Sequence, residues 1–137
     1  MANEWTLWAA IVAIVKADTG PGGIVTLLGQ AAPLKQWGDP GMSARPIIAG
    51  SLGERTPLSP TEGHYRVPVT FDVFADPGSG DLPMRTLDRL EVVLTAVNLA
   101  AQGVDAAPFV RRRRSLPQMT TQGGQREAVD IDFLMTR

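Results

Sequence analysis

The sequence contains no cysteine, and His64 is the only histidine among its 137 residues. The lack of cysteine excludes disulfide scaffolds, thiolate zinc sites and cysteine nucleophiles. A single histidine excludes a metal site built from several histidines of one subunit. The formal net charge is −1, so no overall electrostatic field attracts nucleic acid or an acidic membrane. We therefore expect no bound cofactor and no metal ion.

Long hydrophobic runs are also missing. The most apolar stretch, Trp5–Val15, is well short of the roughly 20 residues that a membrane-spanning helix needs. The residues before it include Glu4 but no lysine or arginine, which is the wrong charge for a signal peptide. With 44% hydrophobic content, the chain is large enough for one globular domain spanning residues 1–137. These features predict a protein made in the cytoplasm, with no membrane partner.

A strand followed by a helix is predicted between His64 and Gly103. Residues 65–73 alternate between apolar and polar, which indicates a strand with one face on a core. From residue 87 onward the apolar spacing changes to three and four, which places these residues on one helical stripe. Asp81 is the expected N-cap and Gly103 the expected end of this helix. The apolar residues are Tyr65, Val67, Val69, Phe71 and Val73 in the strand, and Leu87, Leu90, Leu94, Val97 and Ala101 in the helix.

A first helix is predicted from Asn3 to about Lys16, whereas the pattern does not decide the state of residues 24–28. This helix is apolar almost all round, so either its own domain or another subunit covers it. The expected fold class is α+β: an antiparallel sheet of about four strands with two helices packed on one face, in the order helix, hairpin, helix, hairpin. The strands are expected at 45–52, 65–75, 109–116 and 127–136. In the last strand, the side chains expected in the core are Val129, Ile131, Phe133 and Met135. In the first helix, the residues expected to be buried are Trp5, Trp8, Ile11, Val12 and Val15.

No catalytic constellation is found. His64 lies near Glu62 and Ser59 in the sequence, but a serine–histidine–acid site needs a strained nucleophile turn and an oxyanion hole, and no Gly-x-Ser-x-Gly motif is present. The acidic pair Asp130 and Asp132 lacks the loop pattern of a calcium site. Strand alternation places both aspartates on one solvent-facing side. These residues therefore offer no arrangement with which an enzyme could work.

Four consecutive arginines, Arg111–Arg114, are the most conspicuous polar feature. In a regular strand, Arg111 and Arg113 point to one face, and Arg112 and Arg114 to the other, so at most two share a face. Which of these faces meets solvent is not decided by the sequence.

Asp130 and Asp132 lie in the expected partner strand of these arginines. Opposite charges across a strand pair stabilise a sheet by roughly 0.2–1 kcal/mol. Ion pairing across strands or between subunits is therefore favoured over direct contact with nucleic-acid phosphates. We hypothesise that at least one arginine bridges subunits.

The segment 29–44 is rich in Gly, Pro and Ala, and it contains Trp37 and Met42. Loops of this length without structure of their own are uncommon and usually serve an interface or a site. Trp37 either anchors such an interface or folds back as a satellite of the core. The predicted subunit or partner contacts are Trp5, Trp8, Trp37, Met42, Arg111, Arg112, Arg113, Arg114, Asp130 and Asp132.

Several local features together resemble a known family. They are an apolar opening helix, an extended segment ending in residues 45–51, an arginine-bearing strand at 65–75 that runs into a long amphipathic helix, and an alternating strand at 128–136 that closes the chain. This order resembles the tail-terminator (tail-completion) family of long-tailed bacteriophages, which includes related minor tail proteins of prophages and gene transfer agents. The likeness covers nearly the whole chain as a pattern of elements.

The resemblance implies a structural virion protein, not an enzyme, located at the head-proximal end of the tail. Family members assemble as a homo-oligomeric ring, usually a hexamer, on the tail tube; the ring stops tube polymerisation and presents a surface to head-completion or neck proteins. Double-stranded DNA passes through the lumen without sequence-specific binding. In a ring the contacts are heterologous, so two different patches of each subunit must match.

Three alternatives belong to other classes or to neighbouring proteins. One is a head–tail connector or neck protein of similar fold. Another is a small nucleic-acid-binding module that uses Arg111–Arg114, with salt-dependent affinity as its mark. A third, an enzyme with a site between subunits, is disfavoured by the shortage of suitable titratable residues.

Overall fold

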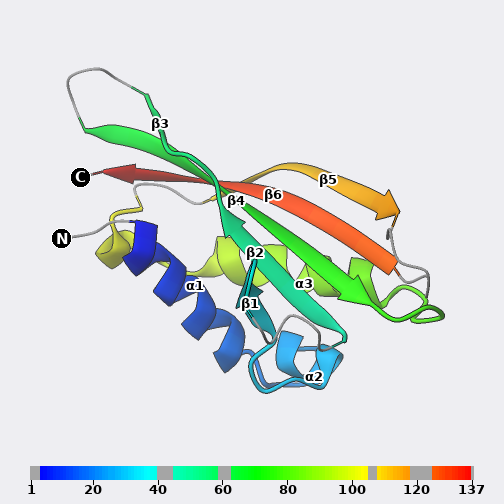
Figure 1. Cartoon of the computed structure of the whole chain (residues 1–137). Coiled ribbons are helices and arrows are strands. Elements are labelled where there is room, and N and C mark those ends of the chain that lie inside the picture. Colours follow the sequence, from blue (N-terminus) through cyan, green and yellow to red (C-terminus); the bar gives the residue numbers. More distant parts are fainter. Residues whose placement is uncertain (1–3, 40–44, 59–62, 105–107, 118–124, 137) are drawn as a thin grey trace.

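One six-stranded sheet organises the computed structural model (Figure 1). The strands lie in the order β1-β2-β4-β6-β5, and the short β3 pairs with β4. All pairs are antiparallel except β1 with β2. The structure describes residues 4–39, 45–58, 63–104, 108–117 and 125–136. The strands are β1 (Leu34–Gln36), β2 (Ile47–Leu52), β3 (Thr56–Pro57), β4 (His64–Ala75), β5 (Phe109–Pro117) and β6 (Gln125–Thr136).

The two longest strands, β4 and β6, pair along their whole length, from His64 opposite Thr136 to Ala75 opposite Gln125. Their alternating Val, Ile and Phe side chains suit a pleated surface with one buried face. The predicted core face of this pair is confirmed, because each of its residues is at most 3% exposed. These residues are Tyr65, Val67, Val69, Phe71, Val73, Val129, Ile131, Phe133 and Met135.

Three α-helices cover this face and share one hydrophobic core with it. They are α1 (Glu4–Ala17), α2 (Ile24–Leu28) and α3 (Leu82–Ala96). The segment 24–28, undecided from sequence, is thus a short helix, and Gly29 ends it in the left-handed conformation with φ 64°. The ion pair between Arg89 of α3 and Asp18 holds α3 to the turn that precedes α2, with N–O distances of 2.9 and 2.7 Å.

The side of helix α1 that packs on the sheet differs from the predicted side. Leu7 is buried in place of Trp5, which is 64% exposed, and Val12 is only partly buried. Trp8 packs against Gly50 of β2, where a Cβ would overlap the indole ring, so glycine permits this close approach. The buried stripe is therefore rotated about the helix axis, and Trp5 lies at its margin.

Helix α3 also departs from its predicted ends. It stops at Ala96, because Val97 is extended and the side chain of Asn98 accepts a hydrogen bond from the backbone N–H of Ala100. A 3-10 turn, η2 (Ala100–Gln102), follows, and Gly103 ends that turn with φ 82° instead of ending the helix. The side chain of Asp81 makes no N-cap hydrogen bond; its Oδ1 lies 3.5 Å from Nη1 of Arg85 instead.

The α+β class and the packing of helices on one face agree with the prediction. The counts do not, since the described residues form six strands rather than about four, and three α-helices rather than two. The additional elements β1, β3 and α2 have three, two and five residues. Segments so short carry too few residues for a periodic signal.

An arginine–aspartate network on the open face of the sheet

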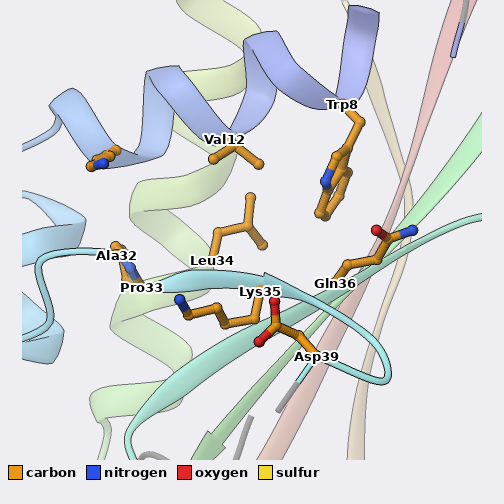
Figure 2. Close-up of a pocket in the computed structure, with 9 residues that line it drawn as sticks. Trp8, Val12, Ala32, Pro33, Leu34, Lys35, Gln36 and Asp39 are labelled. Atoms are coloured by element: carbon orange, nitrogen blue, oxygen red, sulfur yellow. The ribbon is translucent and has the colours of Figure 1, made fainter. Parts of the chain in front are cut away.

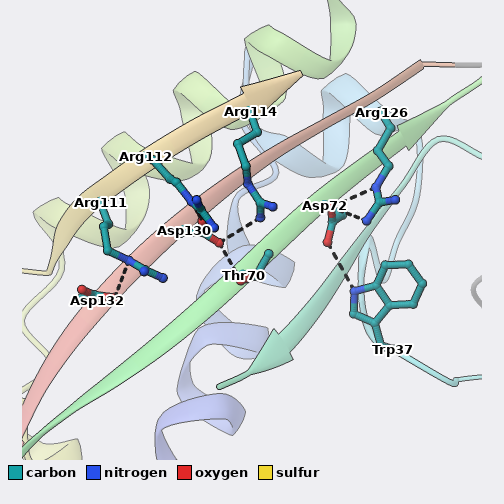
Figure 3. Close-up of polar contacts among 9 residues, drawn as sticks. All are labelled: Trp37, Thr70, Asp72, Arg111, Arg112, Arg114, Arg126, Asp130 and Asp132. Carbon is teal, nitrogen blue, oxygen red and sulfur yellow. Dashed lines mark hydrogen bonds and ion pairs between the residues drawn. The ribbon is translucent and has the colours of Figure 1, made fainter. Parts of the chain in front are cut away.

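The face of the sheet that points away from the helices, here called the open face, carries charged side chains (Figure 3). Asp72 of β4 and Asp130 and Asp132 of β6 are each at most 2% exposed. Asp130 and Asp132 share a face, as predicted, but the expectation that this face leaves them in solvent is wrong. Arginine side chains cover them and supply the opposite charge that buried carboxylates require.

A β-bulge changes the expected alternation of the arginine run. The register between β5 and β6 shifts between Val110 and Arg112, which leaves Arg111 as an extra residue. Arg111, Arg112 and Arg114 therefore all reach aspartates of the open face, whereas Arg113 pairs with Asp88 and Glu91 of α3 on the other side. The prediction that at most two of the four arginines share a face is wrong, because a bulge interrupts the period of two.

Asp130 is the most completely bonded aspartate of the open face. It accepts hydrogen bonds from Nε of Arg112 at 2.6 Å, from Nη2 of Arg114 at 3.1 Å and from the hydroxyl of Thr70 at 2.6 Å. Burial raises the pKa of Asp130, but the hydrogen bonds from Arg112 and Thr70 and the charge of Arg114 outweigh it, so the pKa lies below its usual value. The predicted pairing of the arginine run with Asp130 across the strands is confirmed.

Asp72 joins this network to the loop that follows β1. It accepts hydrogen bonds from Nε of Arg126, at 3.1 Å, and from the indole N–H of Trp37, at 3.4 Å. The guanidinium of Arg126 lies over the rings of both Trp37 and Phe74, 5.7 and 5.1 Å from their centroids. Trp37 meets Phe74 edge to face at 5.4 Å. Trp37 thus folds back onto the sheet, although 43% of it stays exposed.

Asp132 differs from the other two aspartates. Its carboxylate lies 3.5 Å from Nε of Arg111 and 3.8 Å from Nε of Arg66, which are ion-pair distances. Neither of its oxygens accepts a hydrogen bond from a described residue, although both are buried. We call the whole set the arginine–aspartate network: Arg66, Thr70, Asp72, Arg111, Arg112, Arg114, Arg126, Asp130 and Asp132.

The remaining predicted contact residues are spread over the molecule. Trp5 is exposed on α1, and Trp8 is buried beside β2. Met42 lies outside the described residues. His64 lies at the start of β4, and its Nδ1 is 3.2 Å from the hydroxyl of Thr136. Among the described residues, this contact does not form part of a nucleophile–base pair.

Sequence reasoning missed Arg66, Thr70, Asp72 and Arg126 as members of the network. Their common signal is their place in β4 and β6 at positions that alternate with the core residues. Only the strand register shows that they meet, because Arg126 and Asp72 are 54 residues apart in the chain.

A cleft of about 270 Å³ lies between α1 and β1 (Figure 2). Lys16 and Lys35 supply positive charge and Asp39 a carboxylate, but the lining contains no nucleophile paired with a general base. Its residues are Trp8, Val12, Lys16, Ala32, Pro33, Leu34, Lys35, Gln36 and Asp39. Across the described residues, no group of three or more acidic or histidine side chains is arranged to hold a metal ion. No helix in the described ranges has the length and apolarity needed to cross a membrane.

The sequence matches no protein-family model and no curated protein. Solved structures do match. A chain from the virion of a native gene transfer agent (GTA) particle superposes with a TM-score of 0.70 over 94% of this chain and 94% of that chain. The two sequences are 14% identical, so the match establishes a shared fold. The fold described above is therefore one that a gene transfer agent particle contains.

Proposed function

We propose that this protein is a structural component of a virion or gene transfer agent particle, and that it forms a ring on the head-proximal end of the tail tube. In that role the ring stops tube polymerisation and joins the tail to the head or neck. The observation that carries the proposal is the shared fold, over nearly the whole of both chains, with a component of a gene transfer agent virion. The order of elements that resembles tail terminators points to the same role.

Exposed apolar side chains on separate sides of the molecule support an assembling protein. Trp5 lies on α1, Met84 and Val92 lie on α3, and Phe109 begins β5; each is at least 45% exposed. Exposed apolar side chains that gather on one element, as Met84 and Val92 do on α3, mark surfaces that other proteins cover. A ring subunit needs contacts with two neighbouring copies and with partners above and below, which suits this distribution.

The polar groups of the molecule also suit a structural role. In the part of the chain that the structure describes, the charged residues of the open face pair with one another across strands instead of converging on a pocket. Such a network stiffens a sheet, because it fixes the side chains of three adjacent strands at once. We therefore propose a non-enzymatic function.

Deleting the gene in the particle's producer tests this function. Without a terminator, tube subunits continue to add, so we expect tails of irregular, excessive length and DNA-filled heads without tails. Expression of the wild-type chain from a plasmid should restore tails of uniform length. Particles with normal, attached tails in the deletion strain would contradict the proposal.

Nucleic-acid binding is the second candidate, and it is favoured by an excess of guanidinium groups on the open face. Five arginines face three aspartates there, and the side chains of Arg66, Arg111 and Arg112 are 41%, 45% and 58% exposed. A DNA-binding protein would lose affinity linearly with the logarithm of salt concentration. Titration of a labelled duplex at several salt concentrations measures this slope, and a slope near zero excludes the second candidate.

A further inference from the structure

Asp132 and its two arginines form the least completely bonded part of the arginine–aspartate network among the described residues; the Nε of Arg114 is the other buried polar atom of the network without a hydrogen bond. Buried polar atoms are nearly always hydrogen-bonded, yet both carboxylate oxygens of Asp132 lack such a bond. Arg111 and Arg66 are held beside Asp132 by charge at 3.5 and 3.8 Å, and neither guanidinium donates a hydrogen bond to any residue that the structure describes. Their side chains are nearly half exposed, so their donors are available to a group outside the subunit.

The surroundings of these two arginines are partly apolar. Phe109, which is 45% exposed, lies opposite Asp132 in the register of β5 with β6, and Leu134 lies opposite Arg66 in the register of β4 with β6. Two cations over one buried carboxylate leave a small positive excess beside an exposed aromatic ring. This combination fits a protein surface that presents carboxylates between apolar side chains better than it fits a phosphate backbone, which offers no apolar partner.

The chain itself carries such a surface on α3. Asp81, Met84, Asp88 and Val92 follow at spacings of three and four, which places them on one side of the helix. Asp81 pairs with Arg85 and Asp88 with Arg113 inside the subunit, yet the two aspartate side chains remain 71% and 64% exposed and keep acceptor capacity for a second cation. Met84 and Val92 are 54% and 55% exposed. These four residues are called the α3 stripe. It lies on the helix side of the sheet, opposite the open face.

We propose that, in the assembly, the open face of one copy docks on the α3 stripe of the next copy. Arg66 and Arg111 bind the carboxylates of the stripe, and Phe109 packs on its apolar residues. This inference rests on the proposed self-assembly and names the two surfaces that meet. Because they lie on opposite sides of the molecule, the contact is heterologous, and repeating it generates a ring when the rotation closes.

Charge reversal on each surface tests the contact. The first variant carries Arg66→Glu and Arg111→Glu, together with Asp132→Asn so that no like charges meet at the buried site. The second variant carries Asp81→Arg and Asp88→Arg. Native mass spectrometry should find each variant alone at the 14.7 kDa chain mass, whereas the wild-type chain forms the ring. Circular dichroism checks that each variant keeps its fold.

Mixing the two variants gives the sharpest result. In the mixture, every contact between unlike variants joins opposite charges, so rings should return with equal numbers of both variants. A control with Lys16→Glu and Lys35→Glu in the α1–β1 cleft changes the net charge on another surface and should leave the wild-type ring unchanged. Folded variants that fail to assemble when mixed would overturn the proposal.

Other outcomes distinguish a failure of this inference from a failure of the proposed function. If the first variant forms the same ring as the wild-type chain, the docking surface is wrong while the proposed function stands. If that ring also loses salt-sensitive binding of a DNA duplex, the two arginines serve DNA instead of a second copy. A wild-type chain that stays monomeric at every concentration tested would contradict the proposed function itself.

Discussion

The helix-covered face of the sheet is filled with apolar side chains, whereas the open face buries three aspartates under arginines. On the first face, Phe71 and Phe133 lose all contact with water, and burial of apolar area drives their packing. On the second face, each buried carboxylate loses its hydration, and the arginines offset that cost only where distances and angles are good.

This difference separates what holds the subunit together from what remains available to other molecules. The apolar face is closed, because three helices cover it. The open face has no cover from the described helices, and its guanidinium groups keep part of their surface in water. We therefore expect substitutions on the covered face to act on stability, and substitutions on the open face to act more on assembly.

The largest effect is expected from Phe71→Ala on the covered face. The ring is fully buried, so its removal should lower the free energy of unfolding by about 3–5 kcal/mol. A urea melt measures the change, and the exposed Leu58→Ala serves as a control with little effect. An unchanged midpoint for Phe71→Ala would show that the comparison assigns the core to the wrong face.

A smaller effect is expected from Asp130→Asn on the open face. The substitution keeps the shape but removes the charge that Arg112, Arg114 and Thr70 bond. Both arginines retain contact with water and can be hydrated, so we expect a loss of about 1–3 kcal/mol in the same melt. A loss as large as that of Phe71→Ala would show that the network contributes as much to stability as the apolar core.

The loss of stability at low pH allows the network to be compared with the Asp18–Arg89 ion pair of the helix layer. The hydrogen bond from Arg89 holds the pKa of Asp18 below its usual value, and the pKa of Asp130 is also lowered in the folded state. A carboxyl with a depressed folded-state pKa contributes stability above its unfolded pKa of about 3.9 and loses it as pH falls through the folded-state pKa.

Unfolding free energies between pH 6 and pH 2 should therefore decline, and Asp18→Asn and Asp130→Asn should each flatten part of the decline. Asp76→Asn, at an exposed turn position, is the matched control and should leave the profile unchanged. An Asp130→Asn profile parallel to that of the wild-type chain would remove the network as a source of acid sensitivity.

The smallest effect is expected from Arg112→Gln. Its side chain is 58% exposed, and exposed ion pairs contribute about 0–1 kcal/mol. Asp130 keeps Arg114 and Thr70 as partners in this variant. A thermal melt should shift by a few degrees at most, and a loss comparable with that of Asp130→Asn would show that Arg112 alone balances the buried charge.

The covered face could be predicted from the sequence, and the open face could not. Period-two residues such as Val67, Val69 and Phe71 report burial directly, because one face of the strand is uniformly apolar. The same period assigned Asp130 and Asp132 to solvent, since a pattern of polarity does not show that arginines of a neighbouring strand will cover them. The bulge at Arg111 and the register that brings Arg126 to Asp72 are tertiary features without a local signal.

The interface candidates show the same limit. An all-round apolar helix at residues 4–17 could be recognised, but its rotation on the sheet depends on Gly50, where the missing side chain admits Trp8. The role of Trp37 was open between interface and core because its partners, Asp72 and Phe74, lie in a strand far along the chain.

The most direct test of the account is electron microscopy of tail tubes grown from the cognate tube protein with and without this chain. The account predicts a ring at one end of each tube, of about six times the 14.7 kDa chain mass, and no further growth at that end. Tubes that keep lengthening at both ends, without a ring, would contradict the central claim.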